Sequence, residues 1–293
     1  MQYEGIDHIA LIAAPGAAQE FDKLGFRLSP PYHLAGTGIE RQLILTGTQT
    51  QPFGIALDVV VDEAEAGKSA LGRLAQRAPG ARGPVYAVAL RIADMPAALK
   101  ELSGKGLVAK TEEVFVHERT KLWDLAVLPE REEAYAQLLL VQYARPAGEW
   151  FADCEQAGML RHSLDLRRLD HLAATTPRED AAKAFWQDVL GIPQSGELVG
   201  SSGNFIRQFK LGDAIVELIG AATANSPVRS RPPGLSSMTA FEVPDLDMAV
   251  CVARAAGFTI SDPAVGPLPG THVSRIPAEE LGGLGLQLLQ YVR

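Results

Sequence analysis

The chain is poor in cysteine: its 293 residues contain only Cys154 and Cys251, which lie far apart. Without a CxxC spacing there is neither a disulfide framework nor a thiolate metal site, so we interpret both as small apolar residues. The sequence also lacks an apolar run near the roughly 20 residues that span a bilayer. Its first residues lack the basic and apolar regions of a signal peptide. We therefore expect a reduced, cytoplasmic protein without a membrane partner.

Positive charge is also in deficit, because 27 Lys and Arg stand against 35 Asp and Glu, for a formal net charge of -8. Nucleic-acid binding needs clustered cations. The densest group here, Arg161 with Arg167 and Arg168, is interleaved with Asp165 and Asp170. We therefore expect no nucleic-acid partner. The sequence contains no P-loop, no GxSxG motif and no Rossmann fingerprint either, which excludes the common sites that carry them.

What the sequence does contain is a repeat. The segment Ile6–Ala10 (IDHIA) returns as Leu169–Ala173 (LDHLA), and each copy is followed by a proline, a helix-like stretch and Leu-Gly-apolar. A second pattern recurs as Ala89–Met95 (ALRIADM) and Ala240–Leu246 (AFEVPDL). Both halves end in near-identical strands, LVQY and LLQY. The chain is therefore a duplication of a duplication, with four units in the order A, B, A′, B′.

Each unit reads as one strand, one helix and then three strands. In the third unit, the alternating segments 204–210 and 214–219 flank a Gly-Asp turn. Because the units pair within each half, we predict one domain over residues 1–145 and a second over 168–293. The connector, 146–167, contains Pro, Gly and an apolar set that is consistent with one helix.

These residues resemble the vicinal-oxygen-chelate superfamily, which contains glyoxalases, bleomycin-resistance proteins and extradiol dioxygenases, and in particular its glyoxalase-like branch. The opening Ile-Asp-His-Ile-Ala, the Leu-Gly-Phe after the first helix and Gly36-Thr37-Gly38 carry the resemblance. It implies an α+β fold of two tandem domains, each with paired βαβββ modules that form a half-open barrel of mixed strands. It leaves the reaction open, because this fold carries lyases, dioxygenases, epimerases, thiol transferases and metal-free binders.

The resemblance also implies where a metal would bind. In the family, side chains from the first and last strands of each module hold a divalent ion such as Fe, Mn, Ni or Zn. In the second half these positions are His171, Glu217, Met238 and Gln287. A thioether does not suit a hard ion, and an amide oxygen is a weak ligand. We therefore expect a partly degraded site in which His171, Glu217 and Gln287 are the metal ligands, if a metal binds, and Met238 and Gln287 contact the small molecule.

In the first half the same positions read His8, Asp58, Ala87 and Leu139. Two of these cannot bind a metal, so we expect a mainly structural role for this domain. Both halves nevertheless keep a histidine and an acid. One interpretation is a two-ligand metal site that water or substrate completes. The other, which we favour, is that the imidazole and the carboxylate satisfy each other inside a cavity.

Two further side chains are candidates. Because residues of a strand alternate between its two faces, the sequence leaves open whether either one points into the cavity. His272 lies in a strand of the fourth unit and would serve as an acid or base if it faces the cavity. Arg207 alternates with Phe205 and Phe209. It would recognise a carboxylate or phosphate from inside the barrel, whereas on the other face it is an ordinary solvated residue, the alternative that we favour.

Three functions follow from these residues. The first is a metal-assisted enzyme of lyase, isomerase or ring-cleaving dioxygenase type. The second is a metal-free enzyme that uses His171 and Glu217 as a general base. The third is a binding or resistance protein of the bleomycin-resistance type. We favour an enzyme for a small-molecule substrate, with its cavity in the C-terminal domain, His171, Glu217 and His272 as catalytic residues and a homodimer as a candidate assembly.

Overall fold

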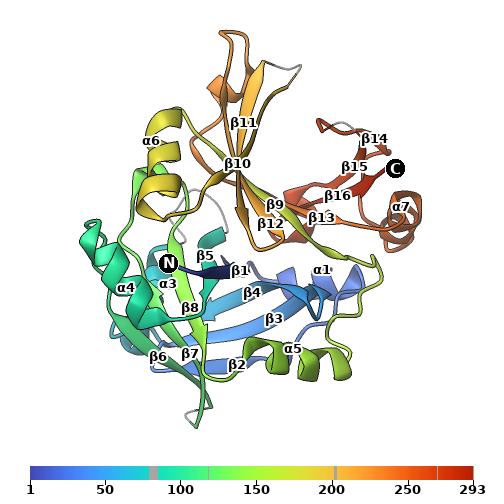
Figure 1. The fold of residues 1–293 in the computed structure, drawn as a ribbon. Coiled ribbons are helices and arrows are strands. Elements are labelled where there is room, and N and C mark those ends of the chain that lie inside the picture. Colours follow the sequence, from blue (N-terminus) through green and yellow to red (C-terminus); the bar gives the residue numbers. More distant parts are fainter. Residues whose placement is uncertain (79–84, 118, 201–202, 269, 293) are drawn as a thin grey trace.

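The computed structural model describes residues 1–78, 85–117, 119–200, 203–268 and 270–292. Their strands form two separate eight-stranded sheets, one from each half of the chain (Figure 1). The first half lies below the second in that view, and the N-terminus is in the lower sheet. The predicted α+β fold with two tandem domains is confirmed.

The first domain contains two βαβββ modules. The first module consists of β1 (Tyr3–Ile12), α1 (Ala17–Lys23), β2 (Tyr32–Ala35), β3 (Ile39–Thr48) and β4 (Gln51–Val60). The second consists of β5 (Val85–Ile92), α4 (Met95–Gly104), β6 (Thr111–Val116), β7 (Thr120–Val127) and β8 (Leu138–Tyr143). Between the modules lie two short helices, α2 (Glu63–Ala66) and α3 (Ala70–Arg77), and a single 3-10 turn, Glu132–Ala134, precedes β8.

The second domain repeats the same order. Its first module consists of β9 (Arg168–Thr175), α6 (Glu179–Ala184) with a π turn (Phe185–Val189), β10 (Gln194–Val199), β11 (Asn204–Leu211) and β12 (Ala214–Ala221). Its second consists of β13 (Gly234–Glu242), α7 (Leu246–Ala255), β14 (Ala264–Val265), β15 (Thr271–Ile276) and β16 (Gly285–Tyr291), with 3-10 turns at Pro227–Ser230 and Ala278–Leu281. Among the described residues, none of the helices has the length and apolar character that crossing a membrane requires.

The recurring Asp and Gln of the second sequence pattern hold the start of the module helix. The carboxylates of Asp94 and Asp245 each accept a hydrogen bond of 2.9 Å from a backbone N–H in the first turn of α4 and α7. The side-chain oxygens of Gln142 and Gln290, from the last strand of the domain, accept from the first N–H of the same helices, at 2.6 and 3.3 Å. Both halves therefore use one N-capping arrangement.

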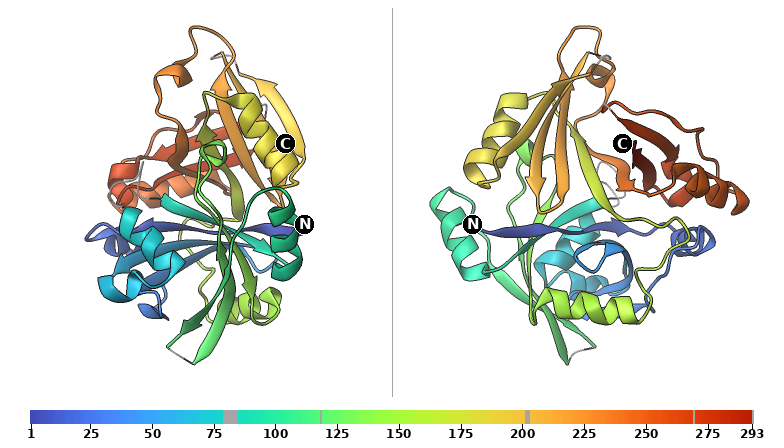
Figure 2. Two further views of the ribbon diagram at one scale, coloured as in Figure 1. Left: turned by 90° about the vertical axis from the view of Figure 1, so that its left-hand side faces the viewer. Right: turned by 45° about the vertical axis from the view of Figure 1, so that its right-hand side comes forward.

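The two sheets differ in closure. In the first domain β2 pairs with β6, and this pair closes the strands into a barrel. Their counterparts in the second domain, β10 and β14, lie at opposite edges of an open sheet. The two arms of that sheet diverge from β9 and β13 (Figure 2). The expected half-open barrel is thus found in the second domain, whereas the first is closed.

The interior of the closed barrel is filled. Small strand residues leave room at its centre, including Ala10, Ala56 and Ala89, and side chains from α3 and from the connector helix α5 (Ala147–Gln156) pack into the same buried cluster. Among these helix residues, Leu71 of α3 is 0% exposed and Phe151 of α5 is 3% exposed. A barrel of eight strands has an interior just wide enough for side chains, and here those of the strands and of the two helices occupy it.

The two domains share one continuous hydrophobic core. Phe53 of β4 and Phe241 of β13, at 1 and 0% exposure, contact each other with ring centroids 5.7 Å apart. Residues 144–167 belong to neither sheet. The domain limits therefore stay a proposal, with domains over 1–145 and 168–293 and a connector over 146–167. The shared core fixes the orientation of the open sheet relative to the barrel.

We expect Phe53→Ala to lower the free energy of unfolding by about 3–5 kcal/mol, because it leaves a cavity where the two cores meet. Denaturant unfolding followed by fluorescence measures this loss. Val265→Ala, at a site that is 80% exposed, is the control and should change stability by no more than about 0.5 kcal/mol. An equally small effect of Phe53→Ala would contradict a shared core.

Candidate functional site

The repeated Asp-His pair lies at an irregularity of the sheet in each domain. In the second domain β9 has one residue more than β13 at this point, so Asp170 is the extra residue beside His171. In the first domain Asp7 is the extra residue beside His8 in the same way. A bulge re-aims side chains locally. Here it lets each carboxylate reach the ring of the histidine that follows it.

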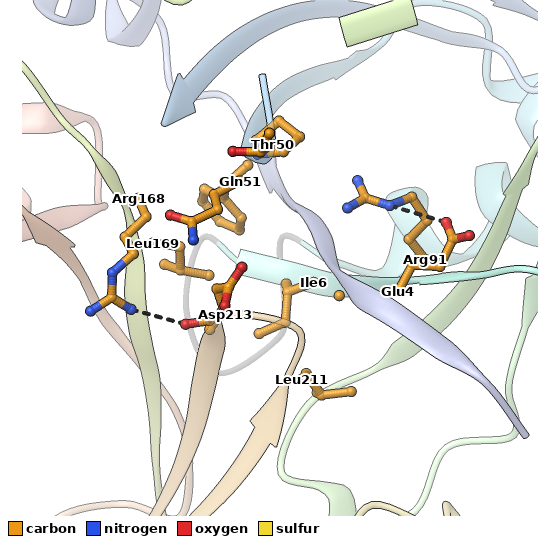
Figure 3. Close-up of a pocket in the computed structure, with 13 residues that line it drawn as sticks. Glu4, Ile6, Thr50, Gln51, Arg91, Arg168, Leu169, Leu211 and Asp213 are labelled. Atoms are coloured by element: carbon orange, nitrogen blue, oxygen red, sulfur yellow. Dashed lines mark hydrogen bonds and ion pairs between the residues drawn. The ribbon is translucent and has the colours of Figure 1, made fainter. Parts of the chain in front are cut away.

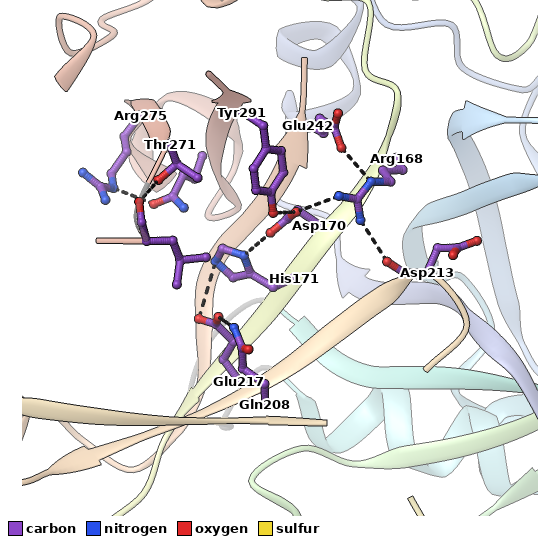
Figure 4. Close-up of polar contacts among 12 residues, drawn as sticks. Arg168, Asp170, His171, Gln208, Asp213, Glu217, Glu242, Thr271, Arg275 and Tyr291 are labelled. Carbon is purple, nitrogen blue, oxygen red and sulfur yellow. Dashed lines mark hydrogen bonds and ion pairs between the residues drawn. The ribbon is translucent and has the colours of Figure 1, made fainter. Parts of the chain in front are cut away.

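The Asp170 carboxylate fixes the orientation of the His171 ring (Figure 4). Its Oδ1 lies 2.7 Å from Nδ1 of His171, and its Oδ2 accepts hydrogen bonds from Tyr291 Oη at 2.7 Å and Arg168 Nη2 at 3.2 Å. Burial by itself raises the pKa of Asp170, but the hydrogen bonds and charges of these partners outweigh it and lower that pKa.. An ionised Asp170 holds the proton on Nδ1, which leaves Nε2 as the reactive nitrogen.

Nε2 of His171 lies 3.8 Å from Oε2 of Glu217. The Glu217 residue is 4% exposed, and its Oε1 accepts a hydrogen bond of 2.9 Å from Nε2 of Gln208, its direct partner across β11 and β12. The two side chains therefore share a face of the open sheet and lie close together, as the sequence predicted for a carboxylate that needs a partner.

The surrounding charges favour the protonated form of His171. Burial and, to a smaller extent, the charge of Arg275 lower the pKa of this imidazole, but the hydrogen bond to Asp170 and the charges of Glu217 and Asp170 outweigh them, so the pKa is raised. The side chain of His171 remains 14% exposed, whereas that of Asp170 is 1% exposed. A ligand on this face can therefore reach the ring but not the carboxylate that orients it.

Gln287 and Met238 lie on the same face as His171. Gln287 pairs with Ala240 of β13, and Ala240 pairs with His171 of β9, so the three residues form a row across the sheet. Met238 precedes Ala240 by two residues on β13 and therefore points to the same side. Oε1 of Gln287 accepts a hydrogen bond of 2.9 Å from Nε of Arg275 on β15.

The structure does not bring His272 and Arg207 to this face. Arg275 pairs with Gln287 and therefore shares the face of His171. His272 lies three residues before Arg275 on β15, and because successive residues of a strand alternate between faces, it points to the other side of the sheet. Arg207 directly precedes Gln208 on β11 and lies on the opposite face, where it forms ion pairs with Asp180 and Glu197 at 3.2 and 3.3 Å. Neither residue belongs to the cluster around His171.

Sequence reasoning missed four residues of this cluster: Asp170, Tyr291, Gln208 and Arg275. Two of them had a visible signal, because Asp precedes His and Tyr follows Gln in both halves of the chain. In the first domain, Tyr143 Oη likewise donates to Asp7, at 3.3 Å, but to Oδ1, the oxygen that also contacts His8.

The first domain places its own arginine beside the equivalent histidine. Arg41 Nη1 lies 3.5 Å from Nε2 of His8, and the same guanidinium binds both oxygens of Asp58 at 2.7 and 2.8 Å. Asp58 also accepts a hydrogen bond of 2.5 Å from Tyr86. Arg41 and Asp58 are 1 and 0% exposed, so this polar group is sealed inside the barrel and satisfies itself.

One expected correspondence between the domains was wrong. His171 of β9 pairs with Ile215 of β12, and Glu217 lies two residues after Ile215. His8 of β1 pairs with Gly54 of β4, and the residue two places after Gly54 is Ala56. Asp58 therefore lies two residues further along the strand than Glu217 does. The acid at the equivalent position is absent from the first domain. Ala87 and Leu139, by contrast, do match Met238 and Gln287 in register.

The donor set of the open sheet does not fit a divalent metal. Within the described residues no three His, Cys, Asp or Glu side chains come together to hold one. His171 and Glu217 are two suitable donors, but the oxygen of Gln287 already accepts from the Arg275 guanidinium, and Met238 offers only a thioether. The Arg275 guanidinium beside Gln287 would repel a metal cation. Catalytic metal sites ordinarily have three protein ligands, and only two are suitable here.

Two cavities lie between the domains and away from His171. One, of about 40 Å³, is lined by residues of both sheets that include Arg91, Gln51 and Arg168 (Figure 3). It is large enough for water only. The other, of about 520 Å³, lies between α3, β5, residues 130–137 and the start of β13. Its volume is in the range of small-molecule sites.

Residues 170–274 match the family described as the Glyoxalase/Bleomycin resistance protein/Dioxygenase superfamily. No curated protein matches the sequence. Solved structures are similar over nearly the whole chain. A hypothetical protein from Staphylococcus aureus has a TM-score of 0.64 at 9% identity, with 97% of this chain and 98% of that chain covered. A mutant of 4-hydroxymandelate synthase from Streptomyces coelicolor has a TM-score of 0.64 at 14% identity, with 100 and 94% covered.

A methylmalonyl-CoA epimerase from Mycobacterium tuberculosis is similar to 46% of this chain, at 22% identity and a TM-score of 0.40, with 93% of that chain covered. At these identities the likeness of the two full-length structures concerns the fold. The resemblance read from the sequence is confirmed: the chain has the vicinal-oxygen-chelate fold, built from two tandem pairs of modules.

We expect His8→Ala to destabilise the protein and leave the second domain intact. His8 is 2% exposed and stacks on Trp123 at 5.5 Å between ring centroids. Its removal should therefore lower the free energy of unfolding by about 2–4 kcal/mol, measured in denaturant. The ring NMR signals of His171 should keep their positions, because the two sites share no side chain. A displacement of these signals as large as that caused by Asp170→Asn would refute the independence of the two histidine sites.

Proposed function

We propose that the chain is a small-molecule enzyme of isomerase or lyase type whose active site is the His171 face of the open sheet. The observation that carries the proposal is the hydrogen bond of 2.7 Å between Asp170 and Nδ1 of His171. It leaves Nε2 directed at the face, beside Glu217. This is the arrangement of a general base with an orienting carboxylate.

The chemistry we assign is proton transfer at a carbon next to a carbonyl group. Nε2 of His171 takes the proton, and the carboxylates of Asp170 and Glu217 stabilise the imidazolium that forms. The hydrogen bond from Gln208 to Glu217 keeps the second carboxylate in place. The same charges that raise the pKa of His171 make the imidazole a stronger base. Returning the proton to a different atom or face gives an isomerase, and loss of a leaving group gives a lyase.

The donor set argues for proton transfer without a metal. A ring-cleaving dioxygenase needs a redox metal held by several protein ligands, and here Gln287 is bonded to an arginine. We therefore place ring cleavage behind isomerisation and elimination. The fold is compatible with all of these reactions, so the assignment depends on the residues of the site.

The test is hydrogen exchange in deuterium oxide. The methylglyoxal–thiol adduct, small 2-oxo acids and catechol are incubated with the protein, with and without a chelator, and followed by NMR. We expect incorporation of deuterium or isomerisation for at least one carbonyl compound, at the same rate with chelator. His171→Ala should reduce the rate by about 100-fold or more, in the range of general-base catalysis.

The matched control is His33→Ala, which removes an exposed histidine from β2 and should leave the rate unchanged. Ring cleavage of catechol that requires an added metal would contradict the proposal. Saturable binding of these compounds without exchange by any of them would instead identify a binding protein.

A further inference from the structure

Arg275 is a cation without a counter-charge on the face that carries His171. Within the described residues its guanidinium forms no ion pair with a carboxylate, and its Nε donates to the neutral amide of Gln287. Two other arginines of the same domain are neutralised. Arg168 pairs with Glu242 at 2.6 Å and Arg207 pairs with Asp180 at 3.2 Å. An arginine has five N–H donors, so most of the Arg275 fork is left for a ligand.

The register of the sheet places Arg275 on the same face as the proposed active site. Arg275 pairs with Gln287, Gln287 with Ala240, and Ala240 with His171, so one straight row crosses β15, β16, β13 and β9. Residues that face each other across a ladder point to the same side. Arg275 lies at one end of this row and His171 at the other (Figure 4).

A second arginine reinforces the positive charge at this end of the row. Arg231 follows the turn Pro227–Ser230 in the segment that links β12 to β13, and its side chain is exposed. It forms no ion pair within the described residues. Arg275 is itself an exposed residue, and the partial shielding of its guanidinium from water, together with the charge of Arg231, lowers its pKa. Two neighbouring cations repel each other unless an anion lies between them.

We propose that Arg275, assisted by Arg231, binds a carboxylate group of the small molecule on which His171 acts. This assignment of a substrate class rests on the proposed function, since it concerns the same site. The planar fork of an arginine matches a carboxylate with two parallel hydrogen bonds. A phosphate would bring a second negative charge toward Asp170 and Glu217, so the site favours a monocarboxylate. In a chain with a net charge of -8, local cations are needed to attract any anion.

The test compares pyruvate with pyruvamide, which has a similar shape and no charge. Each is titrated into the protein while the ring NMR signals of His171 are followed. Pyruvate should produce a saturable shift and pyruvamide should not. Arg275→Gln should weaken pyruvate binding by about tenfold or more, as expected for loss of a charge-assisted hydrogen bond, and Arg231→Gln should weaken it less.

Two further variants control for general charge and for folding. Arg254→Gln removes an arginine in the last turn of α7 that pairs with Asp262, and this variant should bind pyruvate as the wild type does. Gln287→Glu is close to isosteric and places a carboxylate against Arg275, so it should abolish pyruvate binding in a protein that still folds. No saturable shift with pyruvate, equal binding of pyruvamide, an unchanged affinity in Arg275→Gln, or tighter binding of inorganic phosphate would overturn the proposal.

The outcome is separable from that of the proposed function. If pyruvate binding depends on Arg275 while no carbonyl compound exchanges its protons, the carboxylate site stands and the enzyme assignment fails. If His171 catalyses exchange with compounds that bind independently of Arg275, the enzyme assignment stands and the carboxylate site fails.

Discussion

The hydrogen bond between Asp170 and His171 is the interaction on which the proposed chemistry depends. It exists because one extra residue in β9 lets two consecutive side chains meet, which a regular strand would direct to opposite faces. Tyr291 from the last strand and Arg168 from the start of β9 hold the carboxylate. The carboxylate in turn decides which ring nitrogen faces the ligand.

The two halves show how one architecture can serve structure or chemistry. Both have the Asp-His pair, with Nδ1 and the carboxylate 2.7 Å apart. In the first domain the strands close, and a buried Arg41–Asp58 pair fills the space next to the imidazole. In the second domain the strands stay open, and the shorter side chain of Gln208 bonds to Glu217 and leaves the imidazole accessible. The closed domain contributes its core to the interface and so supports the open one.

The fourfold repeat predicted the modules and their order. The family resemblance implied a half-open barrel in each domain, and only the second domain has one. The sequence also predicted the proximity of His171 and Glu217, since a carboxylate among apolar neighbours needs a partner. It could not assign Arg207 and His272 to a face, because alternation leaves the phase of a strand open. The closure of the first barrel depends on pairing between β2 and β6, which are distant in sequence and carry no local signal. The sequence also did not show that Asp58 lies two residues further along its strand than Glu217 does, because this offset depends on the register between β1 and β4 and between β9 and β12.

The most direct measurement is an NMR titration of the His171 ring nitrogens in the wild type and in Asp170→Asn. A raised pKa means that His171 contributes stability that is fully present below its unfolded pKa and is lost as the pH rises through its folded pKa. We predict a midpoint above the ordinary range for histidine and a lower midpoint in Asp170→Asn. Above the midpoint, the neutral ring of the wild type should carry its proton on Nδ1 and none on Nε2. The matched control, Asp213→Asn, removes an exposed carboxylate nearby and should not move the midpoint. An unchanged midpoint in Asp170→Asn, or a neutral ring that carries its proton on Nε2, would contradict this prediction.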